Sequence, residues 1–367
     1  MSDQTALPPT IAPTMAPTMV AMVLTGHGDY DRLSYRTDVP RPSPLAGELL
    51  VRVGAAGVNN TDINTRIGWY ANSAAEDGSV TDGSWTGEAL GFPRIQGADV
   101  CGRVVAVGQG VDPARLGERV LVQACLVSLR QGLLDVWLGS ERDGGFAQYV
   151  CVPSADAHRI NSVLSDAELA SFPCSYATAE NLLTRSRVGV GERVLITGAT
   201  GGVGSAAVQL AKRRGAEVLA VVSPHKMADC AVLGADRLIS RDQPLLEALG
   251  ENTVDVVIDV VGGDKWPDLL HVLKPRGRYA VSGAIAGPMV QMDLRKLYLK
   301  DLTLYGCTAQ EEGVFEALIG YIERGEIKPI LAQTYPLSDL VQAQKDFLAK
   351  RHIGKLVVIP PTDESVR

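Results

Sequence analysis

Residues 57–70, GVNNTDINTRIGWY, concentrate polar side chains directly after an apolar, strand-like run. The stretch contains amides, hydroxyls, one carboxylate and a phenol, but no Cys and no His. Donors such as the Tyr70 hydroxyl, Thr61 or the Asn60 amide can stabilise an oxygen on which negative charge develops, and a tyrosine can pass on a proton. Ionised Asp62 only accepts, so we expect it to orient these donors or to brace a turn. For Tyr70 the alternative is a packed core or rim position.

A second chemical signal lies in residues 193–215, RVLITGATGGVGSAAVQLAKRRG. An apolar strand pattern there runs through a glycine-rich turn directly into a helix pattern. Such glycines allow a sharp turn and close approach of a pyrophosphate, and the helix N-terminus offers free N–H groups. The spacing is G-x-x-G-x-x-G and a structural turn is the alternative, but the surrounding β–α–β pattern favours dinucleotide binding. The expected phosphate contacts are Gly198, Ala199, Thr200, Gly201, Gly202, Val203 and Gly204.

The end of the next strand indicates which dinucleotide binds. An enzyme that uses NAD usually carries Asp or Glu there, about 20 residues after the glycine-rich turn, to bind the ribose hydroxyls. In this chain EVLAVV is followed by Ser223, Pro224, His225 and Lys226, and Arg241 follows the strand after that. A hydroxyl and cations suit a 2′-phosphate, although such cations are often ordinary surface residues. The pattern favours NADP(H) over NAD(H), with Ser223, Lys226 and Arg241 as candidate ligands.

Two kinds of architecture must position these segments. From residue 19 to about 152, short Val-rich runs separated by Gly, Pro and Asp predict a partly open β-barrel or sandwich. From about residue 164 onward, strand and helix patterns alternate, one helix being expected through residues 227–234. This alternation predicts an α/β doubly wound parallel sheet that is covered on both faces. Residues 71–92 are polar and Gly-rich, and we expect a loop that covers a substrate or is mobile.

Length and composition limit the classes of function. A chain of 367 residues, 46% hydrophobic and 21% charged, favours a globular protein of two domains. The net charge of −7 argues against a broad nucleic-acid or anionic-membrane surface. No apolar run could cross a bilayer, and residues 1–18 lack a signal pattern, so we expect a flexible tail and a cytoplasmic protein. The six Cys and five His lack metal-ligand or disulfide spacing.

The order of these parts resembles the medium-chain dehydrogenase/reductase superfamily. GVNNTD, FPRIQGADVCGRVVAVG, LGERVLV, GATGGVG and the closing HIGKLVVIP carry the resemblance, which covers nearly all of residues 19–360. It implies a GroES-like β-barrel catalytic domain and a Rossmann cofactor domain, with the active site between them. We expect a tail at 1–18, a catalytic domain from 19–157 and 309–367, and an NADP(H)-binding domain at 158–308. The family also implies a homodimer, which LTLYGCT (302–308) could form by pairing of edge strands.

The zinc alcohol dehydrogenase branch of this superfamily differs at the metal ligands. It has a Cys where Asn59 stands and a Gly-His-Glu where this chain has Gly97, Ala98 and Asp99. Only Cys174 matches the third ligand position. A catalytic zinc ion needs three protein ligands, so we expect no metal and interpret Cys174 as a packed helix residue.

The chain looks closer to the zinc-free quinone oxidoreductase branch, which uses NADPH. That branch carries GVN-x-x-D followed by R-x-G-x-Y, matched here within residues 57–70. The match implies that Asn59 lies beside the nicotinamide and that Tyr70 faces the substrate. Further candidate cofactor contacts are Thr178, near Asn181 in the helix before the Rossmann unit, and Ser282, Gly283 and Ala284 at the carboxyl edge of the predicted sheet.

Residues 57–70 need no nucleophile if a bound cofactor supplies the hydride, because hydride transfer is the difficult step. We expect NADPH-dependent, zinc-independent reduction of a quinone or an α,β-unsaturated carbonyl compound. Asn60 and Thr61 replace a Pro and an aliphatic residue usual in that branch, so the expected pocket is more polar, with Trp69 and Trp85 as candidate apolar walls. The alternatives are an alcohol dehydrogenase or aldehyde reductase of the same superfamily, and a non-catalytic NADPH-binding protein.

Overall fold

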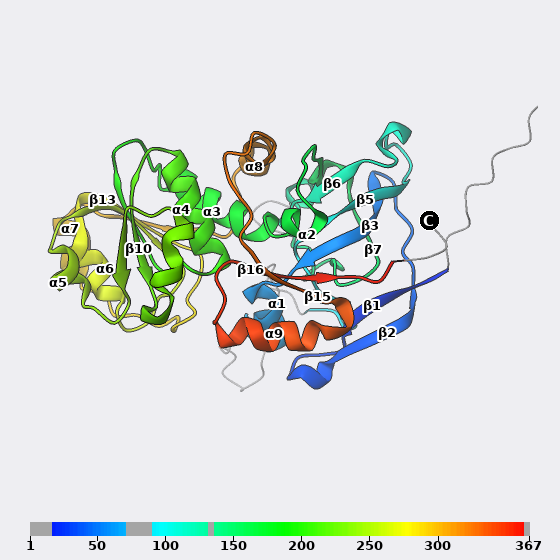
Figure 1. The fold of residues 1–367 in the computed structure, drawn as a ribbon, viewed down its shortest axis with the longest axis horizontal. Coiled ribbons are helices and arrows are strands. Elements are labelled where there is room, and N and C mark those ends of the chain that lie inside the picture. Colours follow the sequence, from blue (N-terminus) through cyan, green and yellow to red (C-terminus); the bar gives the residue numbers. More distant parts are fainter. Residues whose placement is uncertain (1–16, 71–89, 131–135, 363–367) are drawn as a thin grey trace, which may run out of the picture.

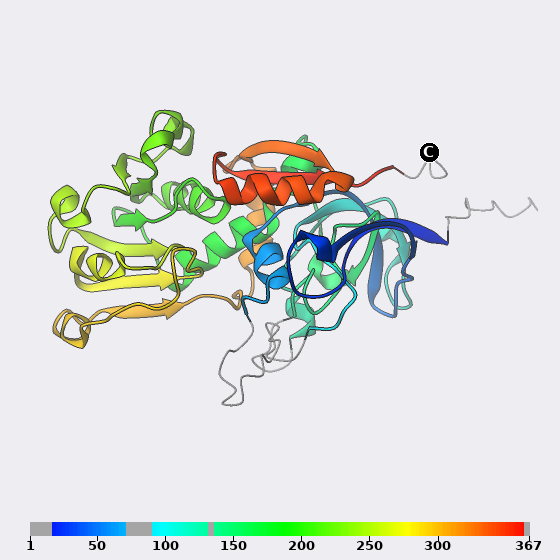
Figure 2. The same cartoon turned by 90° about the horizontal axis from the view of Figure 1, so that it is seen from below.

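The computed structural model describes residues 17–70, 90–130 and 136–362. These residues form an α/β part and a β-rich part that lie side by side (Figure 1). The chain builds the β-rich part first, then the α/β part, and returns at its C-terminal end to add β15 and β16 to the first sheet. The view from below shows that α9 covers this returning segment (Figure 2).

The α/β part contains one sheet of six parallel strands in the order β11-β10-β9-β12-β13-β14. This order is that of the doubly wound Rossmann fold. Its strands are β9 (Arg193–Ile196), β10 (Glu217–Val222), β11 (Arg237–Ser240), β12 (Val254–Asp259), β13 (Leu273–Val281) and β14 (Thr303–Gly306). Its helices, with two that lead into it and one that leads out, are α2 (Asp166–Leu169), α3 (Pro173–Arg185), α4 (Gly202–Arg213), α5 (Leu245–Leu249), α6 (Trp266–Val272), α7 (Leu294–Leu299) and α8 (Val314–Glu323).

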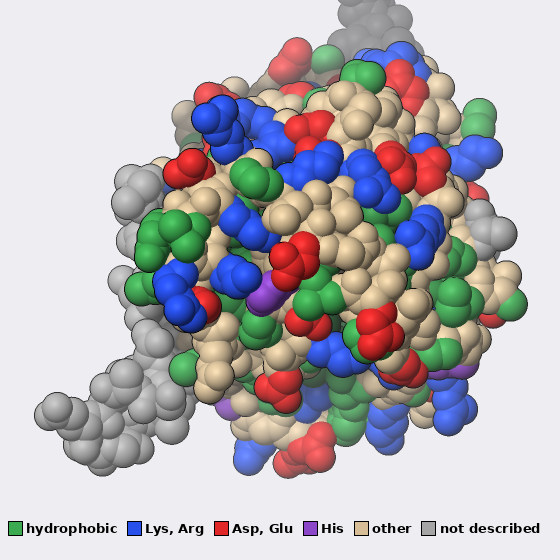
Figure 3. Space-filling view, turned by 90° about the vertical axis from the view of Figure 1, so that its left-hand side faces the viewer, with side chains coloured by type: hydrophobic (Ala, Val, Ile, Leu, Met, Phe, Trp, Pro, Cys, Tyr) green, Lys and Arg blue, Asp and Glu red, His purple; other side chains and the backbone are tan. Residues whose placement is uncertain are grey.

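Alternation along the central strand explains why helices cover both faces of this sheet. Val194 and Ile196 of β9 pack into the core that α3 and α4 close, whereas Leu195 packs with Trp266 of α6 on the other face. Successive side chains of a strand point to opposite faces, so an all-apolar strand needs a cover on each side. The predicted α/β fold class is thus confirmed. On the outer surface of this part, Lys and Arg are mixed with Asp and Glu (Figure 3).

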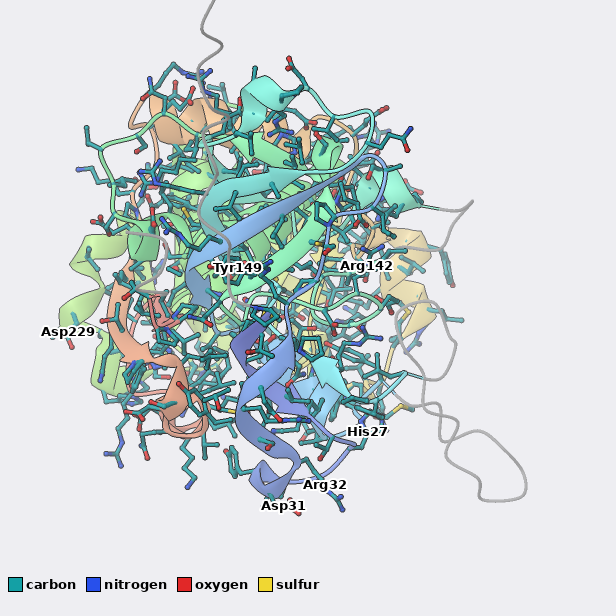
Figure 4. The ribbon with its side chains drawn as sticks, turned by 90° about the vertical axis from the view of Figure 1, so that its right-hand side faces the viewer. His27, Asp31, Arg32, Arg142, Tyr149 and Asp229 are labelled. Atoms are coloured by element: carbon teal, nitrogen blue, oxygen red, sulfur yellow. The ribbon has the colours of Figure 1, made fainter. Side chains whose placement is uncertain are left out.

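The β-rich part is made of a seven-stranded and a three-stranded sheet. The larger has the order β15-β16-β3-β5-β6-β8 with β7 also paired to β3, and the smaller has the order β2-β1-β4. Their bounds are β1 (Thr18–Leu24), β2 (Leu33–Pro40), β3 (Glu48–Gly57), β4 (Arg94–Ile95), β5 (Val100–Val107), β6 (Arg119–Val122), β7 (Tyr149–Pro153), β8 (Ala157–Arg159), β15 (Leu331–Pro336) and β16 (Lys355–Ile359), with helices α1 (Asn60–Arg66) and α9 (Leu340–Ala349). In the end-on view Tyr149 of β7 lies among the strands, and His27, whose Nδ1 donates to Thr65 O over 2.8 Å, lies toward α1 (Figure 4).

Two features differ from the sequence prediction or refine it. The α-helix expected through residues 227–234 is wrong in type, because Ala228–Leu233 forms a 3-10 helix. This segment lies between a 3-10 turn that starts at Pro224 and Gly234 with φ +74°, which leaves too little chain for regular α-helical turns. The expected boundary between residues 157 and 158 falls within β8, which pairs with β6.

Candidate active site between the two parts

The glycine-rich turn after β9 has the geometry of a phosphate cradle. Gly198 adopts φ +58°, a conformation that glycine reaches without strain, and Gly201 is the N-cap of α4. A Cβ atom on Gly204 would lie 2.2 Å from Gly198 O, so the helix packs on the turn more closely than any side chain allows. Gly201 is exposed, and a Cβ there would meet nothing nearer than 3.5 Å. The turn thus combines open space at its tip with the N-terminus of a helix.

The other residues predicted in this turn form its walls. Ala199 and Thr200 are buried, and Val203 is half-buried at the start of α4. A Cβ on Gly202 would lie 2.5 Å from Ser175 Oγ and 3.0 Å from Lys355 Cδ. The turn is therefore enclosed by α3 on one side and by β16, from the β-rich part, on another.

Ser282, Gly283 and Ala284 follow β13 at the same edge of the sheet. Ser282 N donates to Asp259 O over 3.2 Å, and a Cβ on Gly283 would lie 3.2 Å from Val260 O. Val260 also bounds Gly198, because a Cβ there would lie 3.1 Å from Val260 Cγ2. Val260 therefore lies between these predicted contacts and the cradle. All of them are at the carboxyl ends of the strands, where ligands of this fold bind.

The three candidate 2′-phosphate ligands lie in different surroundings. Ser223 is half-buried directly after β10. Lys226 is 5% exposed, and its Nζ donates to His352 O over 2.6 Å and to Thr200 Oγ1 over 3.5 Å. The Arg241 side chain is 63% exposed and lies 3.8 Å from the Asp242 carboxylate. Lys226 is therefore directed to the cradle, whereas Arg241 lies at the surface.

Residues 350–354 also reach the cradle, which the sequence reading missed. Gly354 N donates to Thr200 O over 3.1 Å. Burial, assisted by the Lys226 ammonium, lowers the pKa of Lys350 to about 8. Burial, with the charges of three lysines, lowers the pKa of His352 to about 4. The run KRHIGK was visible in the sequence, but only the tertiary structure places it on a loop that is 150 residues away along the chain.

Asn59 is held by a buried ion pair. Its Oδ1 accepts from Lys355 Nζ over 2.6 Å, and its Nδ2 donates to Asp99 Oδ2 over 2.8 Å. Lys355 Nζ also donates to Asp99 Oδ2 over 2.8 Å and to Val58 O over 3.0 Å, with 3% of the lysine side chain and none of the aspartate exposed. All three ammonium protons thus have acceptors, and the amide is fixed in one orientation.

Asp62 lies near this ion pair and belongs to the capping box at the start of α1. Its Oδ2 accepts from Asn59 N over 2.7 Å, which supports the bracing role weighed in the sequence, while its own carbonyl accepts from Gln96 Nε2 over 2.8 Å. Burial raises the pKa of Asp62 to about 7, against the opposing effects of the Asn59 N–H and the Lys355 charge. The carboxyl group can therefore change its protonation state near neutral pH.

Tyr70 is placed by the helix that precedes it. Asn64 Nδ2 donates to the Tyr70 hydroxyl over 3.2 Å, and Thr61 is a second hydrogen-bond partner. Burial raises the pKa of Tyr70, while these two bonds act against that rise. The hydroxyl is thus a neutral donor at physiological pH. Trp69 is 47% exposed, and Trp85 and most of the 71–92 loop lie outside the described residues.

Cys174 and Thr178 share one face of α3 next to this site. Burial raises the pKa of the Cys174 thiol to about 12, and the Thr178 side chain is hydrogen-bonded to it. Cys174 N donates to Asp99 Oδ1 over 2.5 Å, so the backbone of α3 is tied to the buried ion pair. Asn181 is 1% exposed; its Nδ2 donates to Ala309 O and its Oδ1 accepts from Glu311 N.

The donor set around Asn59 does not suit a divalent metal ion. Across the described ranges, no three His, Cys, Asp or Glu side chains lie where they could hold a metal. Both atoms of the Asn59 amide are already bonded, Ala98 packs in an apolar cluster with Cys125 and Trp137, and Cys174 is a neutral thiol. A tetrahedral zinc site needs three ligands that can be deprotonated or are neutral imidazoles.

Comparisons with known proteins agree with this architecture. Residues 45–162 match the alcohol dehydrogenase GroES-like domain, and residues 202–324 match the zinc-binding dehydrogenase domain. The chain belongs to the medium-chain dehydrogenase/reductase superfamily and is an oxidoreductase of that type. Members of this superfamily use nicotinamide cofactors, which the cradle after β9 fits.

Three relatives illustrate the range of activities. The chain is 46% identical to a crystal structure from Sinorhizobium meliloti 1021 described as a candidate alcohol dehydrogenase, with a TM-score of 0.88 and coverage of 95% of this chain and 98% of that one. It is 28% identical over 351 residues to acryloyl-coenzyme A reductase of Metallosphaera sedula, covering 92% and 99% of the two chains. It is 25% identical over 346 residues to quinone oxidoreductase of Rattus norvegicus, covering 90% and 95%. Among the described helices, none is long and apolar enough to span a membrane.

Proposed function

We propose that this protein is a zinc-independent, NADPH-dependent oxidoreductase that reduces a quinone or an α,β-unsaturated carbonyl compound. The observation that carries this proposal is the Lys355–Asp99–Asn59 network. In it the Lys355 ammonium and its hydrogen bonds occupy the place where the zinc-dependent branch has its metal ligands. The similarity to a quinone oxidoreductase and to an acryloyl-coenzyme A reductase supports the substrate class.

The choice of NADPH rests on charge. No carboxylate follows β10 at the position where it would repel a 2′-phosphate, and the buried Lys226 ammonium lies at the cradle instead. Ser223 and Lys226 would hold the phosphate, and Gly198 to Gly204 would bind the pyrophosphate through their backbone. Thr178, Ser282, Gly283 and Ala284 would bound the nicotinamide side, and Arg241 would contribute only at longer range.

The polar floor formed by α1 would then serve the substrate. When bound, reduced nicotinamide supplies a hydride, and the protein must stabilise the negative charge that develops on the substrate oxygen. Tyr70 is a neutral donor held by Asn64 and Thr61, so its hydroxyl can bond this oxygen and release a proton to it. The Asn59 amide, which is fixed by its hydrogen bonds, would orient the nicotinamide. Asp62 would hold the start of α1 in place.

A second candidate, an alcohol dehydrogenase or aldehyde reductase, is favoured by the relative of 46% identity. The decisive experiment follows NADPH oxidation by purified protein with quinones, enones and simple aldehydes, with zinc content measured in the same sample. We expect turnover with quinones or enones, less than one tenth of a zinc ion per chain, and no effect of a chelator. Turnover of aldehydes alone would favour the second candidate, and loss of turnover with chelator that Zn²⁺ restores would contradict zinc independence. NADPH binding without any turnover would indicate a non-catalytic protein.

A further inference from the structure

Asp259, the last residue of β12, places a fully buried carboxylate at the carboxyl edge of the parallel sheet. Thr197 Oγ1 donates to its Oδ1 over 2.5 Å, and Tyr279 Oη donates to its Oδ2 over 2.7 Å. Two backbone groups of the loop that follows β12 also donate to it, Val261 N over 2.9 Å and Gly262 N over 3.3 Å. Within the described ranges, hydrogen bonds rather than an ion pair therefore satisfy this buried carboxylate.

The two hydroxyl groups around Asp259 are themselves held in place. Thr197 Oγ1 also accepts from Val260 N over 3.1 Å, and the Trp266 side chain is hydrogen-bonded to the Tyr279 hydroxyl. Because the indole N–H only donates, the phenolic proton is left for the carboxylate. Burial, with the Asp259 charge, also raises the pKa of Tyr279, so this proton stays on the phenol. The network thus fixes the backbone directly after β12 in one position.

The loop after β12, residues 260–263, touches both sets of predicted cofactor contacts. On one side it bounds the cradle, because a Cβ atom on Gly198 would lie 3.1 Å from Val260 Cγ2. On the other side it bonds the segment after β13, because Ala286 N donates to Val261 O over 2.8 Å. A displacement of this loop would therefore move the cradle and the segment after β13 relative to each other.

We infer that Asp259 is a positioning residue for the nicotinamide cofactor, because its carboxylate holds the loop that sets the distance between the cradle and residues 282–284. The inference rests on the proposed function and adds to it a residue that acts through its neighbours. The backbone that Asp259 holds would face the part of the dinucleotide that NADPH and NADH share. Asp259 should therefore affect both cofactors alike, whereas Ser223 and Lys226 would act on the 2′-phosphate alone.

The test compares Asp259→Asn with Asp255→Asn, a matched control on the same strand, by fluorescence titration with NADPH and NADH. Asp255 lies at the other end of β12 and accepts from Lys274 Nζ and Arg193 N, each over 2.9 Å. Asn keeps the size of Asp but directs an N–H at groups that are donors themselves. We expect Asp259→Asn to weaken the binding of both cofactors about tenfold, to a similar extent, and Asp255→Asn to change neither by more than about twofold.

Steady-state kinetics and two milder variants extend the test. Asp259→Asn should raise the KM for NADPH and leave kcat at saturating NADPH within about threefold of the wild type, because Tyr70 lies in the other part of the molecule. Thr197→Val and Tyr279→Phe each remove one donor to the carboxylate, and we expect smaller losses of affinity for both cofactors. These two variants carry the test if Asp259→Asn does not fold.

The outcomes separate this inference from the proposed function. Thermal unfolding without ligand measures what each substitution costs in stability. Losses of stability in both Asp259→Asn and Asp255→Asn with wild-type affinities for the cofactors would overturn the inference while the proposed function stands. Weakening of NADPH binding alone would overturn it as well. A wild-type protein that binds neither cofactor would instead contradict the proposed function itself.

Discussion

Asn59 shows how one residue type changes the chemistry of a site. Its amide oxygen faces the Lys355 ammonium and its amide nitrogen faces the Asp99 carboxylate, so each half of the amide meets the charge that it can bond. The pair is buried, and such charges are stable only when every lone pair and proton is satisfied. The amide therefore completes a hydrogen-bonded network in which both of its polar atoms are engaged, and this supports our proposal that catalysis rests on Tyr70 and the cofactor.

Tyr70 is the residue whose removal should affect turnover most directly. Tyr70→Phe deletes the hydroxyl that would stabilise and protonate the substrate oxygen, and we expect turnover to fall about 100-fold. The dissociation constant of NADPH should remain within about twofold, because the cradle lies elsewhere. Steady-state and binding measurements check this, with Tyr35→Phe on β2 as the control, since Tyr35 is 42% exposed. Unchanged turnover in Tyr70→Phe would remove it from the mechanism.

Asp62 should make stability depend on pH in an unusual direction. Its pKa is raised to about 7 in the folded protein, so folding favours its protonated form. This contribution to the free energy of unfolding is fully present below about pH 4 and is lost as pH rises through 7, by an amount on the order of 4 kcal/mol. Above that pH the buried carboxylate is charged and the contribution is absent.

Asp62→Asn removes this titration and retains an acceptor for Asn59 N. The variant should therefore gain stability relative to the wild type as pH is raised from 5 to 8. Urea unfolding of both proteins at several pH values measures the difference. Two stability curves that stay parallel over this range would show that Asp62 does not titrate there.

At the scale of elements, the contact between α4 and the turn after β9 decides whether the cradle exists. Gly204→Ala puts a methyl group 2.2 Å from Gly198 O, so we expect a loss of about 1–3 kcal/mol in the free energy of unfolding. Gly201→Ala meets only Gly198 O at 3.5 Å and should leave stability unchanged within about 0.5 kcal/mol. Because Gly201 is exposed at the tip of the turn, its methyl group should instead weaken NADPH binding.

This pair of variants separates packing from binding. Thermal unfolding without ligand reports the packing of α4, and NADPH titration reports the open space of the cradle. Equal stability of both variants would contradict the close approach of α4 to the turn. Undiminished NADPH affinity in Gly201→Ala would place the phosphates away from the tip.

Other elements position α1. Arg66, at the end of this helix, is 2% exposed, and its guanidinium donates to Gln344 Oε1 on α9 over 3.1 Å and to Gly28 O over 2.8 Å. The same α9 ends at Ala349, shortly before the turn in which Gly354 N donates to Thr200 O over 3.1 Å. Both α1 and this turn are thus attached to α9, so a displacement of α9 would move the two candidate sites together.

At the scale of the whole molecule, we propose that two copies associate through the α/β part. Among the residues that the structure describes, β14 is the last strand of its sheet and pairs with β13 alone, which leaves an edge that a second β14 could extend. Beside it, Leu294 and Leu299 of α7 are 64% and 72% exposed. Hydrophobic side chains are visible on this outer face among charged ones (Figure 3). An exposed edge next to exposed apolar side chains is typical of an interface.

Leu294→Glu combined with Leu299→Glu tests this assembly. We expect the molar mass measured by light scattering to fall from that of a dimer to that of one chain, because two charges on each copy would be buried at the interface. The fold of each copy should be unaffected, since both side chains are exposed. Leu116→Glu, at a residue of 52% exposure in the β-rich part, serves as the control. A wild-type mass of one chain would contradict the proposal outright.

The sequence by itself determined the fold class and the position of the cradle, because these depend on local patterns. Apolar runs such as RVLI mark buried parallel strands, and the spacing of Gly198, Gly201 and Gly204 follows from steric demands that any β–α turn of this kind imposes. The α-helix predicted after β10 was wrong, because apolar spacing does not distinguish a short 3-10 helix from an α-helix.

Only the tertiary structure decided what surrounds the candidate side chains. Lys355 meets Asp99 and Asn59 across 256 and 296 residues of sequence, and Lys226 meets His352 across 126. No periodicity encodes such pairs, because they depend on how the returning β16 packs between the two parts. The roles of the candidate site residues stay predictions. Their burial and charge in the structure are the basis for the expected result of each experiment. Local steric constraints depend on residues that are neighbours in the sequence, whereas the electrostatics of a buried site depend on the tertiary structure of the whole fold.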